Sequence, residues 1–214
     1  MFVNRYVAVD GEYRVSTLDD ATTFGIQSSQ KVGPTVADDI KTSAIWSILF
    51  ALIAIALYIL IRFRNIAFSA GAVVGLVHDV LFILGIYSIF YSIMPFSLEI
   101  DQSFIAAILT VIGYSINDTV VVFDRIRENV GLYPKRALNE LINMSVNSTL
   151  SRTFSTSFST ALPLLAMFIF GGETIRGFVF AILLGVIVGT YSTIFIASPI
   201  AYDIQQKQAK KAQK

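Results

Sequence analysis

The sequence contains no cysteine and only one histidine among its 214 residues. The missing cysteines exclude disulfides, thiolate catalysis and cysteine-ligated metals, and a single histidine leaves little with which to build a zinc site. No G-x-x-x-x-G-K-[ST] loop occurs, so we expect no ATP site within the chain. The formal net charge of +1 gives no indication of nucleic-acid binding. We therefore expect no metal, no organic cofactor and no nucleic-acid partner.

Charged residues are also scarce, at 14% of the chain against roughly 25% in a soluble domain. Hydrophobic residues make up 55% of the chain, and its mean hydropathy is +0.68. An apolar stretch of about 18 residues or more can cross the bilayer as a helix. Five stretches qualify, at 44–61, 67–94, 103–123, 153–170 and 178–200. The sequence thus predicts an all-α membrane protein whose transmembrane bundle occupies residues 42–202.

The cations between these spans predict the orientation of the bundle. Lys and Arg favour the cytoplasmic side of a membrane protein. They follow the first span, lie between the third and fourth, and follow the fifth: Arg62, Arg64, Arg125, Arg127, Lys135, Arg136, Arg152, Lys207, Lys210, Lys211 and Lys214. The loops at 95–102 and 171–177 contain one cation between them, Arg176. We therefore expect an exterior N-terminal segment and a basic cytoplasmic tail at 203–214.

The polar N-terminal segment, residues 1–41, lacks the apolar core of a signal peptide. Residues 5–9 and 13–15 have strand-like composition, but the segment is too short to bury a core alone. We expect it to be the α+β tail of a larger extracytoplasmic domain. We also expect another membrane helix upstream, because five spans leave this polar segment outside with nothing to export it.

Small residues recur at four-residue spacing in the fifth span and in the second. Such a ridge lets another helix approach closely, and it can also set where a partner docks. In the second span the same spacing leads to Asp79. The residues expected at helix contacts are Gly71, Gly75, Gly113, Gly177, Ala181, Gly185 and Gly189.

Asp118 lies within the third apolar span and is the leading candidate for a functional residue. A carboxylate at the bilayer centre costs about 2.5–3.5 kcal/mol on insertion scales, so such residues mostly mark ion or proton pathways. The alternative is a structural carboxylate held by Asn117 or by a hydroxyl. We expect Asp118 and the small and polar face beside it, which includes Gly113 and Asn117, to face the bundle interior.

The fourth span begins in a segment where nine of the thirteen residues from 148 to 160 are Ser or Thr. Arg152 and Pro163 lie on one side of this helix with Thr156 and Ser159, a combination that suits a helix that moves or is hydrated. Arg152 is also explained as a snorkelling cation at the cytoplasmic interface. Residues 124–147 alternate charged and apolar positions, which predicts an amphipathic helix lying at that interface.

His78 and Asp79 admit a proton relay or a structural pair equally well. An enzyme is also conceivable. Asp79 and Asp118 on separate helices would suit an intramembrane aspartyl protease, and Ser115 with His78 a Ser–His dyad. Both readings are weak, because Asp118 lacks a preceding Gly-x-Gly turn and Ser115 lacks a following glycine.

The segment VIGYSINDTVVVFDRIREN at 111–129 closely resembles the signature of the SecF family, the smaller half of the bacterial SecDF protein-export motor in the RND superfamily. The likeness continues through AGAVVGLVHDVLF, SVNSTLSRT and FGGETIRGFVFAILLGVIVGT, and through the exterior VGPTVADDIKTSA. By this resemblance the five helices are the second to sixth of a six-helix half. Asp118 and Arg152 occupy the positions of the family's proton-transport pair, and we expect Asn117, next to Asp118, to take part in proton transport as well.

The resemblance also implies partners and an energy source. The expected partners are a SecD half, separate or fused, the SecYEG channel, a YajC-type auxiliary protein and the preprotein. The proton-motive force would drive the motor in the bacterial inner membrane, with Na⁺ as an alternative coupling ion. Another RND-type transporter, one that moves small amphiphiles, is the alternative function.

Overall fold

The computed structural model describes residues 5–9, 12–16 and 34–212, and the chain divides into two compact units at Asp39 and Ile40. In the N-terminal unit, strands β1 (Arg5–Val9) and β2 (Glu12–Ser16) form a two-stranded antiparallel sheet. Arg5 pairs with Ser16, and Val9 pairs with Glu12. The predicted strands at 5–9 and 13–15 are therefore present.

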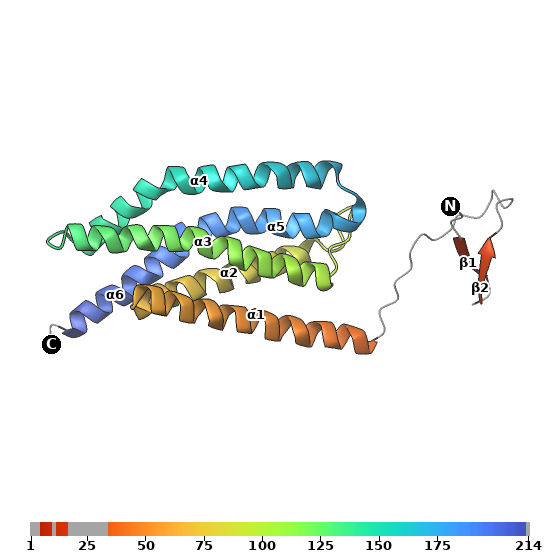
Figure 1. Cartoon of the computed structure of the whole chain (residues 1–214), viewed down its shortest axis with the longest axis horizontal. Helices are drawn as coiled ribbons and strands as arrows, with labels where there is room; N and C mark the ends of the chain where they lie inside the picture. The colour runs from red at the N-terminus through yellow and green to blue at the C-terminus, as the bar shows by residue number, and fades with distance from the viewer. Residues whose placement is uncertain (1–4, 10–11, 17–33, 213–214) are drawn as a thin grey trace. The chain divides into compact units, whose positions relative to one another are not determined.

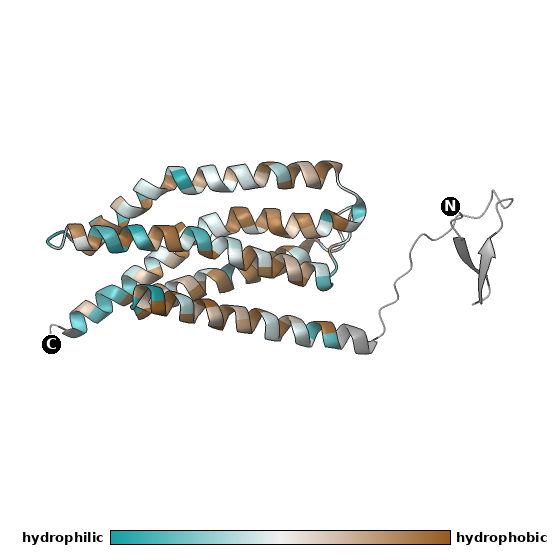
Figure 2. Ribbon diagram, viewed as in Figure 1, coloured by the Kyte–Doolittle hydropathy of each residue, from teal (hydrophilic) through white to brown (hydrophobic). Residues whose placement is uncertain are grey.

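The second unit is a bundle of long helices (Figure 1). Among the described residues, five helical segments are long and apolar enough to cross a membrane, and the fifth runs without a break from Glu173 to Lys211. This confirms the predicted bundle. Figure 2 shows apolar residues along much of α1, α2 and α5, paler and polar residues over the middle of α4, and polar ones at the α3–α4 connection and along α6. The helices are α1 (Pro34–Phe63), α2 (Ile66–Phe90), α3 (Gln102–Leu132), α4 (Leu138–Phe170), α5 (Glu173–Ser192), the π-helical turn η1 (Thr193–Ala197) and α6 (Ser198–Ala212).

The predicted interfacial helix at 124–147 does not form as a separate element. Residues 124–132 continue α3, and residues 138–147 are the first turns of α4. The buried side of each extension explains this difference. Asn129 and Ser145 are buried and hydrogen-bonded to each other across the hairpin, so the two helices stay packed together beyond the apolar spans.

Local sequence sets where several helices begin. Asn65 caps α2 by accepting a hydrogen bond from the Ala67 amide at 2.9 Å, and Asp101 caps α3 by accepting one from the Phe104 amide at 2.8 Å. The turn between α1 and α2 contains only two residues. Arg64 takes a φ of 53° there, a left-handed conformation that is uncommon outside glycine.

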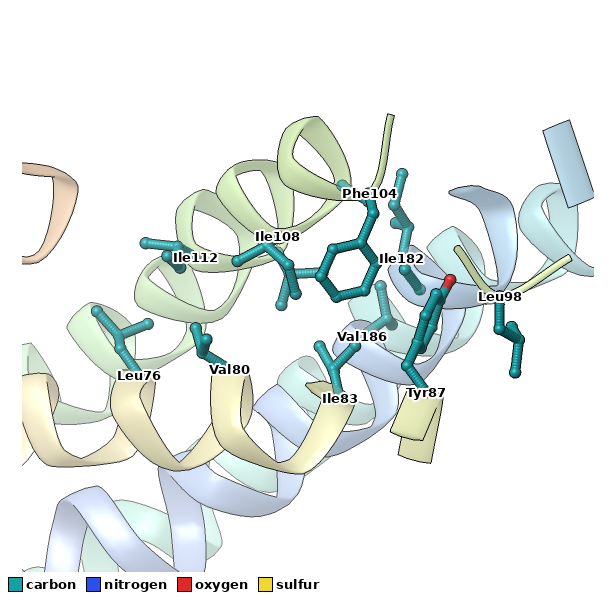
Figure 3. Close-up of a cluster of buried hydrophobic side chains, with 13 residues drawn as sticks. Leu76, Val80, Ile83, Tyr87, Leu98, Phe104, Ile108, Ile112, Ile182 and Val186 are labelled. Carbon is teal, nitrogen blue, oxygen red and sulfur yellow. The ribbon is translucent and has the colours of Figure 1, made fainter. Parts of the chain in front are cut away.

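The main hydrophobic cluster lies where α2, α3 and α5 meet (Figure 3). Tyr87 from α2 and Phe104 from α3 place their ring centroids 4.5 Å apart. A second cluster, nearer the α3–α4 connection, contains the mutually packed rings of Phe63, Phe68 and Phe123. Only 6% of an 18-residue apolar stretch of α1 is buried, so this helix lies at the periphery of the bundle.

The small-residue ridge of α5 packs inside the bundle. A Cβ added to Gly185 would overlap the side chain of Val111, and one added to Gly189 would lie 2.9 Å from the Ser115 side chain. The helix that approaches α5 is therefore α3 of the same chain. Ala181 is fully buried in the main cluster as well.

The other predicted packing glycines divide into two groups. The first group makes the close contacts that the spacing predicted: Gly71 and Gly75 approach Ala197, and Gly177 approaches the Ser97 carbonyl. Gly113 has no such contact within this chain, since no neighbouring atom lies within 4 Å of a Cβ placed there. Its face of α3 is exposed in the described chain, because α4 and α5 pack on the adjacent sides of the helix.

Candidate functional site

Asp118 is buried on α3 at the point where α3, α4 and α5 meet, with 4% of its surface exposed. Ser157 of α4 donates a hydrogen bond of 3.4 Å to Asp118 Oδ2. The Ser157 hydroxyl also shares a 2.6 Å hydrogen bond with Thr190 of α5. A carboxylate with one long hydrogen bond retains acceptor capacity, so Asp118 is free to take up a proton or a further donor.

Arg152 lies on α4 and is exposed in the described chain. Arg152 lies five residues before Ser157, the α4 residue that donates to Asp118, so both side chains belong to the same part of the α3–α4 contact. None of the ion pairs among residues 39–211 joins the two side chains, so their charged atoms lie farther apart than those of a direct salt bridge. The structure thus places the predicted pair in one neighbourhood without bringing the charged atoms together.

Asp79 of α2 is the second buried carboxylate, and it is fully enclosed. Its Oδ2 accepts hydrogen bonds from Ser115 of α3 at 2.7 Å and from Ser192 of α5 at 2.9 Å. Its Oδ1 lies 3.2 Å from Nδ1 of His78. These contacts join three helices through one side chain and satisfy the carboxylate, which is the arrangement of a structural clamp.

Further hydroxyls continue this polar layer towards η1. Thr119 of α3 and Thr193 share a hydrogen bond of 2.9 Å, and both are buried. Thr193 begins the π-helical turn, which lies at the junction of α5 and α6. Single π-helical turns inside longer helices are frequent at functional sites. The end of α5 therefore reaches both carboxylates, because Thr190 bonds Ser157 beside Asp118 and Ser192 bonds Asp79.

Sequence reasoning missed the hydroxyls of α4 that face the interior. Thr156 and Ser159, which were grouped with Arg152, are exposed with it. The buried hydroxyls are instead Ser145, Thr149, Thr153 and Ser157, which we call the hydroxyl column. Their four-residue spacing was present in the sequence, but the density of Ser and Thr in that segment concealed it.

Asn117 was expected to face the interior with Asp118, but within this chain it does not. Asn117 is exposed, as are Ser103, Ala106, Thr110 and Gly113 on the same face of α3. Consecutive helical residues point about 100° apart, so burying Asp118 turns Asn117 towards the outside. Within the described chain Asn117 forms no hydrogen bond to hold Asp118.

The described residues do not form the hydrogen bonds that either enzyme alternative would use. A catalytic pair of carboxylates would share a hydrogen-bond partner. Among residues 39–211, Asp79 and Asp118 share none. The Ser115 hydroxyl donates to Asp79 rather than to His78, so no Ser–His dyad is formed. In the part of the chain that the structure describes, no three His, Cys, Asp or Glu side chains gather as a metal site.

These features define a multi-pass helical membrane protein with a buried, hydroxyl-bonded carboxylate at a junction of three helices. Residues 14–207 match the family described as "Protein export membrane protein SecD/SecF, C-terminal", and the chain belongs to this family.

Relatives and a solved structure agree with the family assignment. The chain is 54% identical over 180 residues to the protein translocase subunit SecF of Rhodothermus marinus, covering 84% of this chain and 58% of the relative. It is 45% identical over 189 residues to SecF of Cereibacter sphaeroides, covering 88% and 56%. A crystal structure of SecDF in its super-membrane-facing form matches with a TM-score of 0.71 and 37% identity, over 87% of this chain and 24% of that one. The chain thus spans little more than half the length of these SecF relatives.

Proposed function

We propose that this chain is the membrane part of a SecF-type subunit that uses a proton gradient to assist the export of preproteins. The observation that carries the coupling role is the burial of Asp118 in a membrane helix with only one long hydrogen bond. A satisfied structural carboxylate would resemble Asp79, which has three polar partners. Family membership supplies the export role and the SecD half as partner.

Proton transfer at Asp118 has a direct route to the packing of the bundle. Ser157 and Thr190 connect Asp118 to α4 and α5, so a change in its charge alters hydrogen bonds on both helices. A proton moving down a potential of 100 mV releases about 2.3 kcal/mol, which is enough to shift hydrogen bonds of this kind. Arg152 would stabilise the ionised form of Asp118 in one state of the cycle.

The proposed orientation follows the distribution of cations. The α1–α2 turn, the α3–α4 connection and the end of α6, together with the helix ends beside them, contain ten of the sixteen Lys and Arg residues, so we place them in the cytoplasm. The N-terminal unit then lies in the periplasm. We propose that the complete motor contains a SecD half, acts with SecYEG and a YajC-type protein, and resides in the bacterial inner membrane.

Depletion of the full-length protein in its host tests the export role. We expect unprocessed preproteins to accumulate, and we expect export to recover when the wild-type gene is restored. Export that stays normal while sensitivity to small amphiphiles rises would contradict the proposal and support a small-molecule transporter. Collapsing the H⁺ and Na⁺ gradients separately in membrane vesicles identifies the coupling ion, and H⁺ is the ion we propose.

A further inference from the structure

The hydroxyl column forms a buried row along α4. Its residues Ser145, Thr149, Thr153 and Ser157 are spaced four apart and thus lie one above another on one helix face. Each has at most 7% of its surface exposed. At one end Ser157 donates to Asp118, and at the other Ser145 accepts a hydrogen bond of 2.7 Å from Asn129. The column therefore runs from the buried carboxylate towards the α3–α4 connection.

Thr153 differs from the other members of the column. Ser145 donates to the Leu141 carbonyl of its own helix, and Thr149 donates to the Ser145 carbonyl. Thr153 has only 2% of its surface exposed, and its buried hydroxyl has no hydrogen-bond partner among the described residues. Buried hydroxyls in proteins are nearly always paired, often with an ordered water.

Helix α3 places an apolar residue opposite Thr153. The contacts of Ser157 with Asp118 and of Ser145 with Asn129 fix the antiparallel register of α3 and α4. One turn along each helix from the Asp118–Ser157 contact, Thr153 is level with Val122, an apolar residue that is 1% exposed. A direct hydrogen bond from α3 is thus unavailable at this position.

The spacing of the column suits water. Residues four apart on a helix rise by about 6 Å. A water that bonds two hydroxyls spans about 5.5 Å, since each O–H···O distance is about 2.7–2.8 Å. One water can therefore bridge Thr153 to Ser157 or to Thr149. A hydroxyl both donates and accepts, so it can hold such a water in either orientation.

We propose that the Thr153 hydroxyl binds water, and that this water carries the transported proton between Asp118 and the α3–α4 end of the bundle. The transport part rests on the proton coupling proposed above, whereas the water site stands on the buried geometry alone. Thr149 and Ser157 flank the water on one helix. Thr153 is a positioning residue, because it acts through the water and forms no hydrogen bond to Asp118.

The absence of cysteine from the chain permits a direct test of hydration. Thr153→Cys in the full-length, assembled protein is irradiated in vesicles with X-rays, which convert bound water to hydroxyl radicals, and labelling of this cysteine by oxidation is read by mass. The matched control is Phe154→Cys at the same depth, because Phe154 is 66% exposed on the outer surface of the bundle. We expect labelling at position 153 and none at 154. An unlabelled thiol at 153 overturns the proposal.

Proton flux in the same vesicles tests the transport role. Thr153→Val keeps the shape of the side chain but removes the hydroxyl, and we expect it to lower flux by about tenfold, the rate effect of one lost hydrogen bond of about 1.4 kcal/mol. Thr153→Ser should restore flux. Ser155→Ala is the control, since Ser155 is exposed and bonds only its own helix.

The outcomes separate this proposal from the proposed function. Wild-type flux in Thr153→Val overturns the proton path through Thr153 while leaving coupling at Asp118 intact. A loss of flux that Thr153→Ser does not restore also overturns it, because packing alone would then explain the loss. Unchanged flux in Asp118→Asn overturns the proposed function itself, and with it the transport role of the water.

Discussion

Ser157 lies between Asp118 and Thr190, 3.4 Å from the carboxylate oxygen and 2.6 Å from the threonine hydroxyl. A single hydroxyl on α4 thus connects the candidate carboxylate of α3 to α5. A hydroxyl that donates to an ionised carboxylate can turn to another acceptor when the carboxylate is protonated. The contact therefore gives the charge of Asp118 a direct influence on how three helices pack.

Asp118→Asn should abolish the stimulation of preprotein translocation by a proton gradient while the bundle stays folded. Asparagine keeps the size of the side chain and still accepts the hydrogen bond from Ser157, but it cannot titrate. Translocation is measured in vesicles that contain the full assembly, with and without a gradient. Asp124→Asn is the control, because Asp124 is partly exposed in a surface ion pair with Arg62. Gradient stimulation that survives in Asp118→Asn would remove Asp118 from the mechanism.

Arg152→Lys should lower proton flux by about tenfold, which corresponds to about 1.4 kcal/mol. Lysine keeps the charge but loses the planar fork with which arginine can hold a carboxylate and a water together. Flux is measured in vesicles, and Arg136→Lys in the exposed α3–α4 connection serves as the control. Wild-type flux in Arg152→Lys would reduce Arg152 to an interfacial anchor and leave Asp118 without its proposed partner.

Gly185→Ala should destabilise the bundle by about 1–3 kcal/mol, the usual effect of overpacking a well-filled interior. The added methyl group would overlap Val111, so α3 and α5 must separate. Gly113→Ala is the matched control on α3, because it meets no atom within 4 Å. Unfolding of the purified chain in mixed micelles measures both. Equal stabilities of the two variants would mean that the bundle yields at Gly185 without cost.

Asp79→Ala should destabilise the bundle strongly, whereas Asp79→Asn should preserve both folding and proton flux. Alanine leaves the Ser115 and Ser192 hydroxyls buried without an acceptor, at about 1–3 kcal/mol for each unpaired group. The asparagine oxygen can still accept from both. Unfolding in mixed micelles and flux in vesicles measure the two effects. A folded Asp79→Asn variant without flux would identify the His78–Asp79 pair as a proton relay instead of a clamp.

The sequence alone predicted the five membrane helices and drew attention to Asp118. Both follow from short-range physical chemistry, since the bilayer sets the length of an apolar helix and makes an acid within it costly. The ridge of Gly185 and Gly189 was equally visible, because the helical period fixes which residues share a face. The resemblance to SecF rested on contiguous blocks and was confirmed by the family match.

Tertiary structure decided which face of each helix is inside. The period of α3 places Asp118 and Asn117 on neighbouring faces, and only packing against α4 and α5 determines that the first is buried and the second is not. On α4, nine hydroxyls within thirteen residues left every face polar, so periodicity could not single out Thr153 and Ser157. The segment at 124–147 became the ends of two helices because Asn129 meets Ser145, a contact between residues sixteen apart. The sequence determined the helices and their chemistry, whereas the buried site required knowledge of which helices are neighbours.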